Sequence, residues 1–150
     1  MLAYASRTGQ SVRVPKIIRA DEVMPLLLAS CPSFSHAWAR IEGDIEPDGT
    51  RLGYVDAGWF SEHLVELLRA GNRDEIATAF AVIERLHVDG DAYVRNLATV
   101  GYLEGIQNGS LNADIDPARF EQYLGPESLR WWKGLNAVRS GESRTLKPID

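Results

Sequence analysis

Hydrophobic and polar residues follow a helical period along most of this chain. Apolar positions recur three and four residues apart, which places them on one face of an α-helix, and no stretch reads as a convincing strand. The predicted helices cover approximately residues 22–30, 34–41, 54–69, 73–88, 92–108, 117–124 and 126–139. The expected fold class is therefore all-α, a compact bundle of six to seven helices.

Capping residues and prolines set the expected ends of these helices. Ser33, Asp91 and Asp116 each stand just before a periodic segment, where a short polar side chain can accept a hydrogen bond from the first turn. Pro25 lacks a backbone N–H and is expected in a first turn, so its helix should begin near Glu22. An Asn-Gly pair at 108–109 is expected to end the fifth helix.

The fifth predicted helix is apolar almost all round and is expected at the centre of the bundle. Ala98, Gly101 and Gly105 form a groove of small residues on it. An internal glycine costs about 1 kcal/mol relative to alanine. We therefore expect a neighbouring helix to approach closely at this groove.

One carboxylate interrupts the apolar surface of this helix. At about 100° per residue, Glu104 projects between Tyr93 and Leu97. A buried carboxylate must be paired, hydrogen-bonded or protonated. Glu104 is therefore expected to reach solvent or an arginine from the helix end. The alternative is a polar site with Gln107 and Asn108, in which Glu104 acts as a general acid or base.

The fourth and fifth predicted helices are joined by a very short turn and must pack antiparallel. The second of them carries the order D-x-x-V-R-x-x-A, which resembles the inner helix of HEAT-type repeats. A HEAT-like hairpin at about 73–108 is therefore an alternative to a plain bundle. Only one good copy is visible, and a solenoid needs at least three repeats.

Length and composition favour one domain without covalent or metal support. The chain has 150 residues, enough to bury a sizeable core, and its one cysteine, Cys31, allows neither an internal disulfide nor a CxxC pair. We expect a flexible leader over 1–15, a helical domain over 16–140 and a flexible tail over 141–150. No apolar run is long enough to span a membrane, and a cytoplasmic location is expected.

The net charge of −5 argues against a general nucleic-acid binder and favours a basic protein partner. The stretch "EGDIEPDGTRLG" holds three glycines and a proline, so it is expected to be a loop. Tryptophan beside acidic residues is typical of a protein-binding surface. The residues predicted to bind a partner are Glu42, Asp44, Glu46, Asp48, Asp56 and Trp59.

Catalytic and metal-binding patterns are weak in this sequence. No HxxxH, HExxH, GxSxG, Walker or GxGxxG motif occurs, and His36, His63 and His87 are each expected in core or capping roles. Trp131 and Trp132 point about 100° apart. We expect Trp131 in the core, on one face with Leu135 and Val138. No catalytic residue, metal or cofactor is predicted.

Four segments carry a resemblance to a known family: "LLLASCPSFSHAW", "FSEHLVELLRAG", "AVIERLHVDGDAYVRNLATVGYLEGIQN" and "FEQYLGPESLRWWKGLN". Together they resemble an uncharacterised family of small bacterial helical proteins, over about residues 22–140. The resemblance implies an all-α fold and a bacterial, cytoplasmic setting. Some members of that family are similar to immunity proteins of polymorphic toxins. The resemblance supplies no catalytic residues.

The most concrete expected function is a non-enzymatic interaction module, an immunity or antitoxin-like protein that binds a basic toxin through acidic and aromatic residues. One alternative is an enzyme or small-molecule binder with a cleft near Glu104. Another is a HEAT-like scaffold or adaptor. The sequence leaves the partner and the oligomeric state open.

Overall fold

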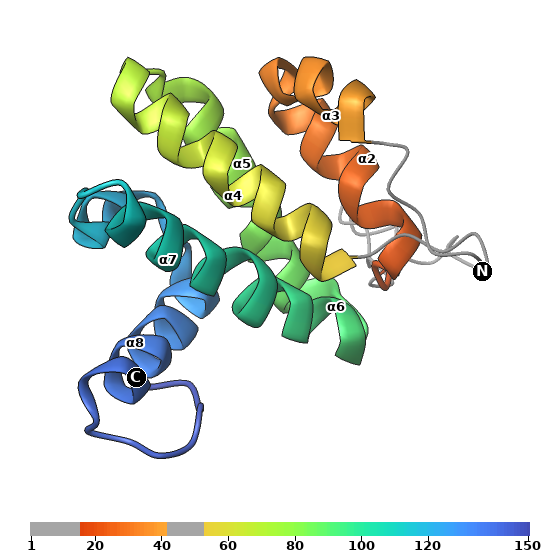
Figure 1. The fold of residues 1–150 in the computed structure, drawn as a ribbon. Coiled ribbons are helices and arrows are strands. Elements are labelled where there is room, and N and C mark those ends of the chain that lie inside the picture. Colours follow the sequence, from red (N-terminus) through yellow and green to blue (C-terminus); the bar gives the residue numbers. More distant parts are fainter. Residues whose placement is uncertain (1–15, 42–52) are drawn as a thin grey trace, which may run out of the picture.

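The computed structural model describes residues 16–41 and 53–150, and it confirms the all-α prediction. The predicted leader and the four loop acids Glu42, Asp44, Glu46 and Asp48 lie outside the described residues. Figure 1 shows the helices wrapped around one another as a compact body. The α-helices are α2 (Ala20–Ser30), α3 (Ser35–Ile41), α4 (Gly53–Ala70), α5 (Arg73–Asp89), α6 (Ala92–Asn96), α7 (Glu104–Asn112) and α8 (Pro126–Ser140).

Short helices of other types link these elements. Two of them are 3₁₀ helices, η1 (Pro32–Phe34) and η3 (Pro117–Tyr123), and the third, η2 (Leu97–Leu103), is a π-helix. Because η2 joins α6 directly to α7, residues 92–112 form one continuous helix with a π segment in its middle. Below, this continuous unit is called the central helix.

The middle of the central helix is enclosed by its neighbours, as predicted, whereas Tyr93 near its start and Asn108 near its end are exposed. Leu97, Ala98, Tyr102, Leu103 and Ile106 are each at most 2% exposed. Its amino terminus is fixed by the Asp91 carboxylate, which accepts a hydrogen bond from the backbone N–H of Val94 (2.9 Å). The helix continues past the Asn-Gly pair to Asn112, so the predicted stop at Gly109 is wrong. Gly109 instead lies beside α4, where a Cβ would stand 3.5 Å from Val65.

The predicted small-residue groove is the contact between the central helix and α4. A Cβ added at Gly101 would lie 3.1 Å from the Cβ of Ala57, and one at Gly105 would lie 2.6 Å from Ser61 Oγ. The contacts advance by four residues on both helices, so α4 and the central helix run in the same direction (Figure 1). The expected close approach is thereby confirmed.

On another side the central helix contacts α5 and α8. The α5–α6 hairpin turns at Gly90 as expected, and it is tied to the start of the chain by backbone hydrogen bonds between Ile18 and residues 89 and 91. Two sets of hydrogen bonds join α8 to the central helix. The His87 ring contacts both Ser128 and Thr99, and Gln107 donates a hydrogen bond to Asn136. Helix α8 therefore contacts the π segment of the central helix and crosses the central helix at a steep angle (Figure 1). The antiparallel hairpin expected at about 73–108 is present, and its relation to HEAT repeats stays a prediction.

Three local predictions are corrected by the structure. Helix α2 begins at Ala20, which places Pro25 in its second turn, where the helix lacks one backbone hydrogen bond. Ser33 lies within η1 instead of capping a longer helix. The core tryptophan of α8 is Trp132, at 1% exposed, because the buried face of that helix follows Ser128, Trp132 and Leu135.

Residues 141–150, expected to be a flexible tail, return along α8. The left-handed Gly141 (φ 85°) turns the chain, and the backbone N–H of Ile149 donates to the Arg130 carbonyl (3.0 Å). Gly134 on α8 is buried beneath the backbone carbonyl of Lys147, so no side chain fits there. The Arg130 guanidinium also holds Asp150 (2.7 Å). Gly134 thus leaves space for residues 141–150 to pack on α8, and helical periodicity alone does not predict this packing.

Candidate functional site

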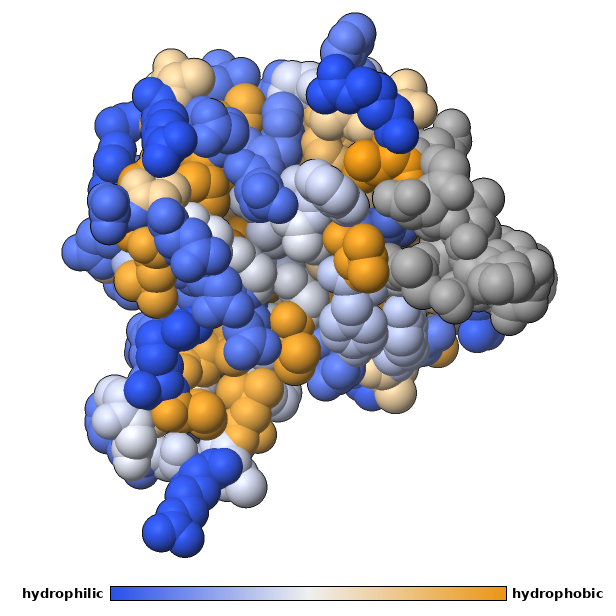
Figure 2. All heavy atoms as spheres, in the orientation of Figure 1, coloured by the Kyte–Doolittle hydropathy of each residue, from blue (hydrophilic) through white to orange (hydrophobic). Residues whose placement is uncertain are grey.

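Large apolar side chains are exposed where α4 and α6 begin. Tyr54, Val55, Trp59 and Tyr93 are 39–45% exposed, and we call this set the aromatic corner. The rings of Tyr54 and Tyr93 meet edge to face with centroids 5.8 Å apart, which joins the two helices across the surface. Figure 2 shows mostly pale residues, with some orange, over the first turns of α4 and α6.

The position of the corner follows from the sequence of α4. Its inner face must carry the core residues Ala57, Phe60, Leu64 and Leu68, all at most 7% exposed. The remaining positions of the same helix point outward, and near its start they are occupied by aromatic and aliphatic side chains instead of polar ones. Exposed apolar residues that cluster in this way typically mark an interaction surface.

Ile17 and Val88 extend the apolar character near the corner. Both are more than half exposed, and the bridge between Ile18 and Gly90 keeps their two segments together. Leu111 and Val138 are exposed as well, but they lie on α7 and α8.

Negative charge is concentrated in the same part of the chain. Residues 42–91 hold twelve acidic side chains against four basic ones, a net charge of −8, whereas the rest of the chain sums to +3. On α4, the exposed Glu62 and Glu66 continue the outward row that begins with Val55 and Trp59. Glu66 is paired with Arg69 (2.8 Å), and Glu62 makes no ion pair among the described residues. The surface of α4 therefore changes from apolar to acidic along its length.

The structure separates the two members of the predicted partner-binding set that it describes. Trp59 is 43% exposed, as a contact residue must be. Asp56 is only 5% exposed, because it lies on the inner side of α4 beside Ala57. Asp56 is thus buried in the fold, and its predicted contact with a partner stays a prediction. Tyr54, Val55 and Tyr93 were not among the predicted residues. Tyr54 and Val55 stand close to the acidic loop in the sequence, whereas Tyr93 is brought beside them only by the fold.

The predicted polar site on α7 is divided between core and surface. Gln107 is fully buried, where it accepts a hydrogen bond from Arg139 Nη2 (3.1 Å) and donates one to Asn136 Oδ1 (3.1 Å). Arg139 also donates to Asn108 Oδ1 (3.0 Å), and Asn108 is exposed. These bonds satisfy Gln107 within the fold and tie α7 to α8, a structural use of the cluster.

Glu104 is partly exposed and makes no hydrogen bond or ion pair within the described residues. A regular helical step places Glu104 beside Leu97, and the π segment explains why the observed position differs. A π turn contains more residues than an α turn. One extra residue before Glu104 rotates it by about 100° relative to Leu97, away from the core. The expected escape of this carboxylate toward solvent agrees with its partial exposure.

A second polar cluster joins residues far apart in the sequence. Ser33 Oγ donates to Glu75 Oε1 (2.7 Å) and lies 2.8 Å from His63 Nε2, while the Ser33 backbone N–H donates to the same carboxylate (3.1 Å). In a hydrolytic triad the carboxylate orients the histidine, whereas here it holds the serine. Burial raises the pKa of the adjacent Cys31 thiol to about 12, which keeps it protonated. The cluster therefore fastens η1 to α4 and α5.

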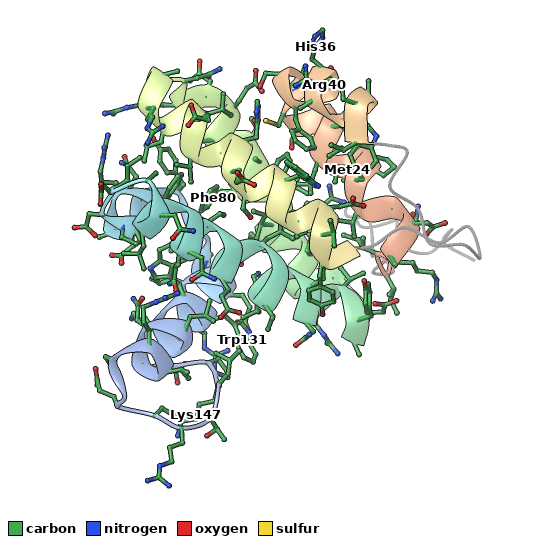
Figure 3. All side chains as sticks on the ribbon, viewed as in Figure 1. Met24, His36, Arg40, Phe80, Trp131 and Lys147 are labelled. Atoms are coloured by element: carbon green, nitrogen blue, oxygen red, sulfur yellow. The ribbon has the colours of Figure 1, made fainter. Side chains whose placement is uncertain are left out.

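The three histidines occupy different environments. Figure 3 shows His36 at the outer tip of α3, pointing away from the molecule. His87 is 4% exposed; its Nδ1 lies 2.9 Å from Ser128 Oγ and 3.1 Å from the Ile83 carbonyl, and its Nε2 lies 2.9 Å from Thr99 Oγ1. Because a carbonyl only accepts, Nδ1 carries the proton, and the Thr99 hydroxyl donates to Nε2. Burial lowers the pKa of His87 to about 4, so it stays neutral.

A carboxylate beside this histidine caps α8. Glu84 accepts hydrogen bonds from the backbone N–H groups of Glu127 (3.0 Å) and Ser128 (2.8 Å). The first turn of α8 has no cap of its own, since Gly125 at its N-cap carries no side chain. His87 and Glu84 thus join α5, the central helix and α8 through buried polar contacts, the core role expected for His87.

Among the described residues, no group of three His, Cys, Asp or Glu side chains is arranged to hold a metal ion. An open concavity of about 520 Å³ is lined by Lys16, Ile17, Arg19, Asp21 and Glu22, and Glu104 is not part of it. Within 16–41 and 53–150, no helix combines the length and apolarity that crossing a bilayer demands.

The chain forms a small all-helical domain that exposes a cluster of apolar side chains at one corner. The sequence matches the model of a domain of unknown function, DUF7674, over residues 24–139, and the chain therefore belongs to this family. This confirms the resemblance to an uncharacterised family. Comparison with curated proteins and with solved structures gives no match.

Proposed function

We propose that this protein is a non-enzymatic interaction module that binds a basic protein partner through the aromatic corner and the outer face of α4. The observation that carries the proposal is the cluster of four large apolar side chains, each 39–45% exposed, of which three lie at the start of the acidic helix α4 and Tyr93 lies beside them on α6. Aromatic residues are enriched at the centres of protein interfaces, and tryptophan and tyrosine contribute a large share of binding energy there.

Charge supports the choice of partner. The segment that contains α4 and α5 is strongly acidic, and exposed acidic residues next to an apolar patch steer a basic partner toward it. In its most specific form, the proposal is a bacterial, cytoplasmic immunity protein that masks a basic toxin. This form is supported by the family resemblance of the sequence and by the acidic surface, and binding without turnover is expected.

The test is quantitative capture from the organism that encodes the chain, with paired variants. Val55→Ser with Trp59→Ala removes the apolar corner, and Leu111→Ser with Val138→Ser is the matched control, because it removes exposed apolar residues elsewhere. We expect one protein to be retained by wild type and control, lost by the corner variant and released by added salt. A captured protein that the corner variant still holds would contradict the proposal.

The immunity form has its own test. The captured protein is expressed alone and then together with this chain, and growth is followed. Arrest by the partner that wild type relieves, and that the corner variant relieves poorly, is the expected outcome. A partner that is harmless when expressed alone would refute the immunity form while leaving the interaction module standing.

A further inference from the structure

The glycine at position 58 has no explanation within the described fold. It lies inside the 18-residue helix α4, where glycine is unfavourable compared with alanine. A Cβ added there would meet no described residue within 4 Å. The other glycines inside helices of the described residues each have a neighbour within that distance: Gly101, Gly105, Gly109 and Gly134.

Gly58 lies inside the aromatic corner. Its neighbours on the outer face of α4 are Val55, one turn before it, the adjacent Trp59, and Glu62, one turn after it. The missing side chain leaves a notch in the helix surface, bordered by two exposed apolar side chains and followed by an exposed carboxylate. A helix surface with such a notch can accept a side chain of a second helix at short range.

The geometry points to an amphipathic basic helix as the partner element, with an apolar side chain seated in the Gly58 notch and basic side chains beside Glu62 and Glu66. This inference rests on the proposed function and names the chemistry of the partner. The row from Val55 to Glu66 spans about 16 Å of helix, which a partner helix of about four turns covers. The apolar contact comes at the start of the row and the charged contact at its end.

The probe for this inference is a synthetic peptide helix of about four turns. It carries leucines on one face of one half and arginines on the same face of the other half. A peptide of the same composition with leucines and arginines intermixed is the control ligand. Binding is measured by fluorescence anisotropy on the full chain, at low and at raised salt.

Gly58→Leu fills the notch, and Ala81→Leu adds the same side chain to an exposed position on α5 as the matched control. We expect the patterned peptide to bind wild type and the Ala81→Leu variant alike and the Gly58→Leu variant at least tenfold more weakly. Glu62→Lys should also weaken binding and reduce its dependence on salt. Far-UV circular dichroism shows whether each variant keeps its helices.

Three outcomes would overturn the inference: no binding of the patterned peptide, equal binding of the intermixed peptide, or unchanged binding by Gly58→Leu. The proposed function is distinguished from it by Trp59→Ala. If Trp59→Ala abolishes binding of the captured partner but Gly58→Leu does not, the corner is the binding surface and the notch is not its anchor. If neither variant affects the partner, both proposals fail.

Discussion

The two faces of α4 both carry small residues, but their surroundings differ. On the inner face, Ala57 and Ser61 lie against Gly101 and Gly105 of the central helix so closely that an added Cβ would overlap Ser61. On the outer face, Gly58 meets no described residue within 4 Å, and it is flanked by exposed Val55 and Trp59. Packing against the central helix thus explains Ala57 and Ser61 on the inner face. No contact within the described residues explains Gly58 on the outer face.

The largest expected effect tests the packed face. Gly105→Leu forces a side chain into Ser61 and should lower the free energy of unfolding by about 3 kcal/mol or more. Gly58→Leu, on the opposite, outer face of α4, is the control. It should change the free energy of unfolding by less than about 1 kcal/mol. Urea denaturation measures both. Equal losses at the two positions would remove the distinction between the faces.

Low pH should destabilise the interior around His87, where α5 contacts the central helix and α8. The neutral form of His87 is favoured in the fold because burial lowers its pKa to about 4, from about 6.5 in an unfolded chain. The associated stability is complete above pH 6.5 and is lost as the pH falls toward 4, in total about 3 kcal/mol. Two carboxylates face this histidine, Glu84 and Glu127, and both oppose the shift.

The measurement is the free energy of unfolding between pH 7 and pH 4.5 for wild type, His87→Gln and His36→Gln. The pH dependence should be smaller in His87→Gln and unchanged in His36→Gln, whose side chain is exposed. Burial also lowers the pKa of His63, so a residual slope of the same sign is expected in His87→Gln. Identical pH profiles for the wild type and His87→Gln would show that the His87 contacts do not resist protonation.

The main features of this fold were readable from the sequence because they depend on local patterns. Asp91 and Asp116 cap their helices as predicted, and Gly71 ends α4 in the left-handed conformation. The small residues at 98, 101 and 105 correctly indicated a close neighbour. Which helix that neighbour would be did not follow, because pairing between helices depends on contacts some forty residues apart.

The projection failed where the backbone departs from the α-helix. A regular 100° step places Glu104 beside Leu97, and no residue in the sequence announces the π segment that rotates it outward. The Ser33–His63–Glu75 cluster was invisible for a different reason, since its members are 30 and 42 residues from Ser33. Of the candidate site, Trp59 was identified from its acidic context, whereas Tyr54, Val55 and Tyr93 read as ordinary apolar positions.

A smaller effect is expected where α5 supports α8. Glu84→Gln keeps the shape of the side chain but removes the charge that accepts two N–H groups at the start of α8. The loss should be about 1–2 kcal/mol in the free energy of unfolding. Glu62→Gln, on the outer face of α4, is the control and should be near neutral. A loss at Glu62 as large as at Glu84 would mean that the outer face also contributes to the fold.

The smallest expected effect is an increase in the free energy of unfolding, and it compares the inner and outer faces of α4 directly. Gly58→Ala should raise the free energy of unfolding by up to about 1 kcal/mol, because alanine is the better helix former and nothing described stands in its way. Gly105→Ala makes the same chemical change but should lower stability, since its Cβ would stand 2.6 Å from Ser61 Oγ. Thermal unfolding of the two variants compares them directly. If Gly58→Ala is destabilising, that glycine already has a neighbour within this chain, and the reason to assign its outer face to a partner disappears.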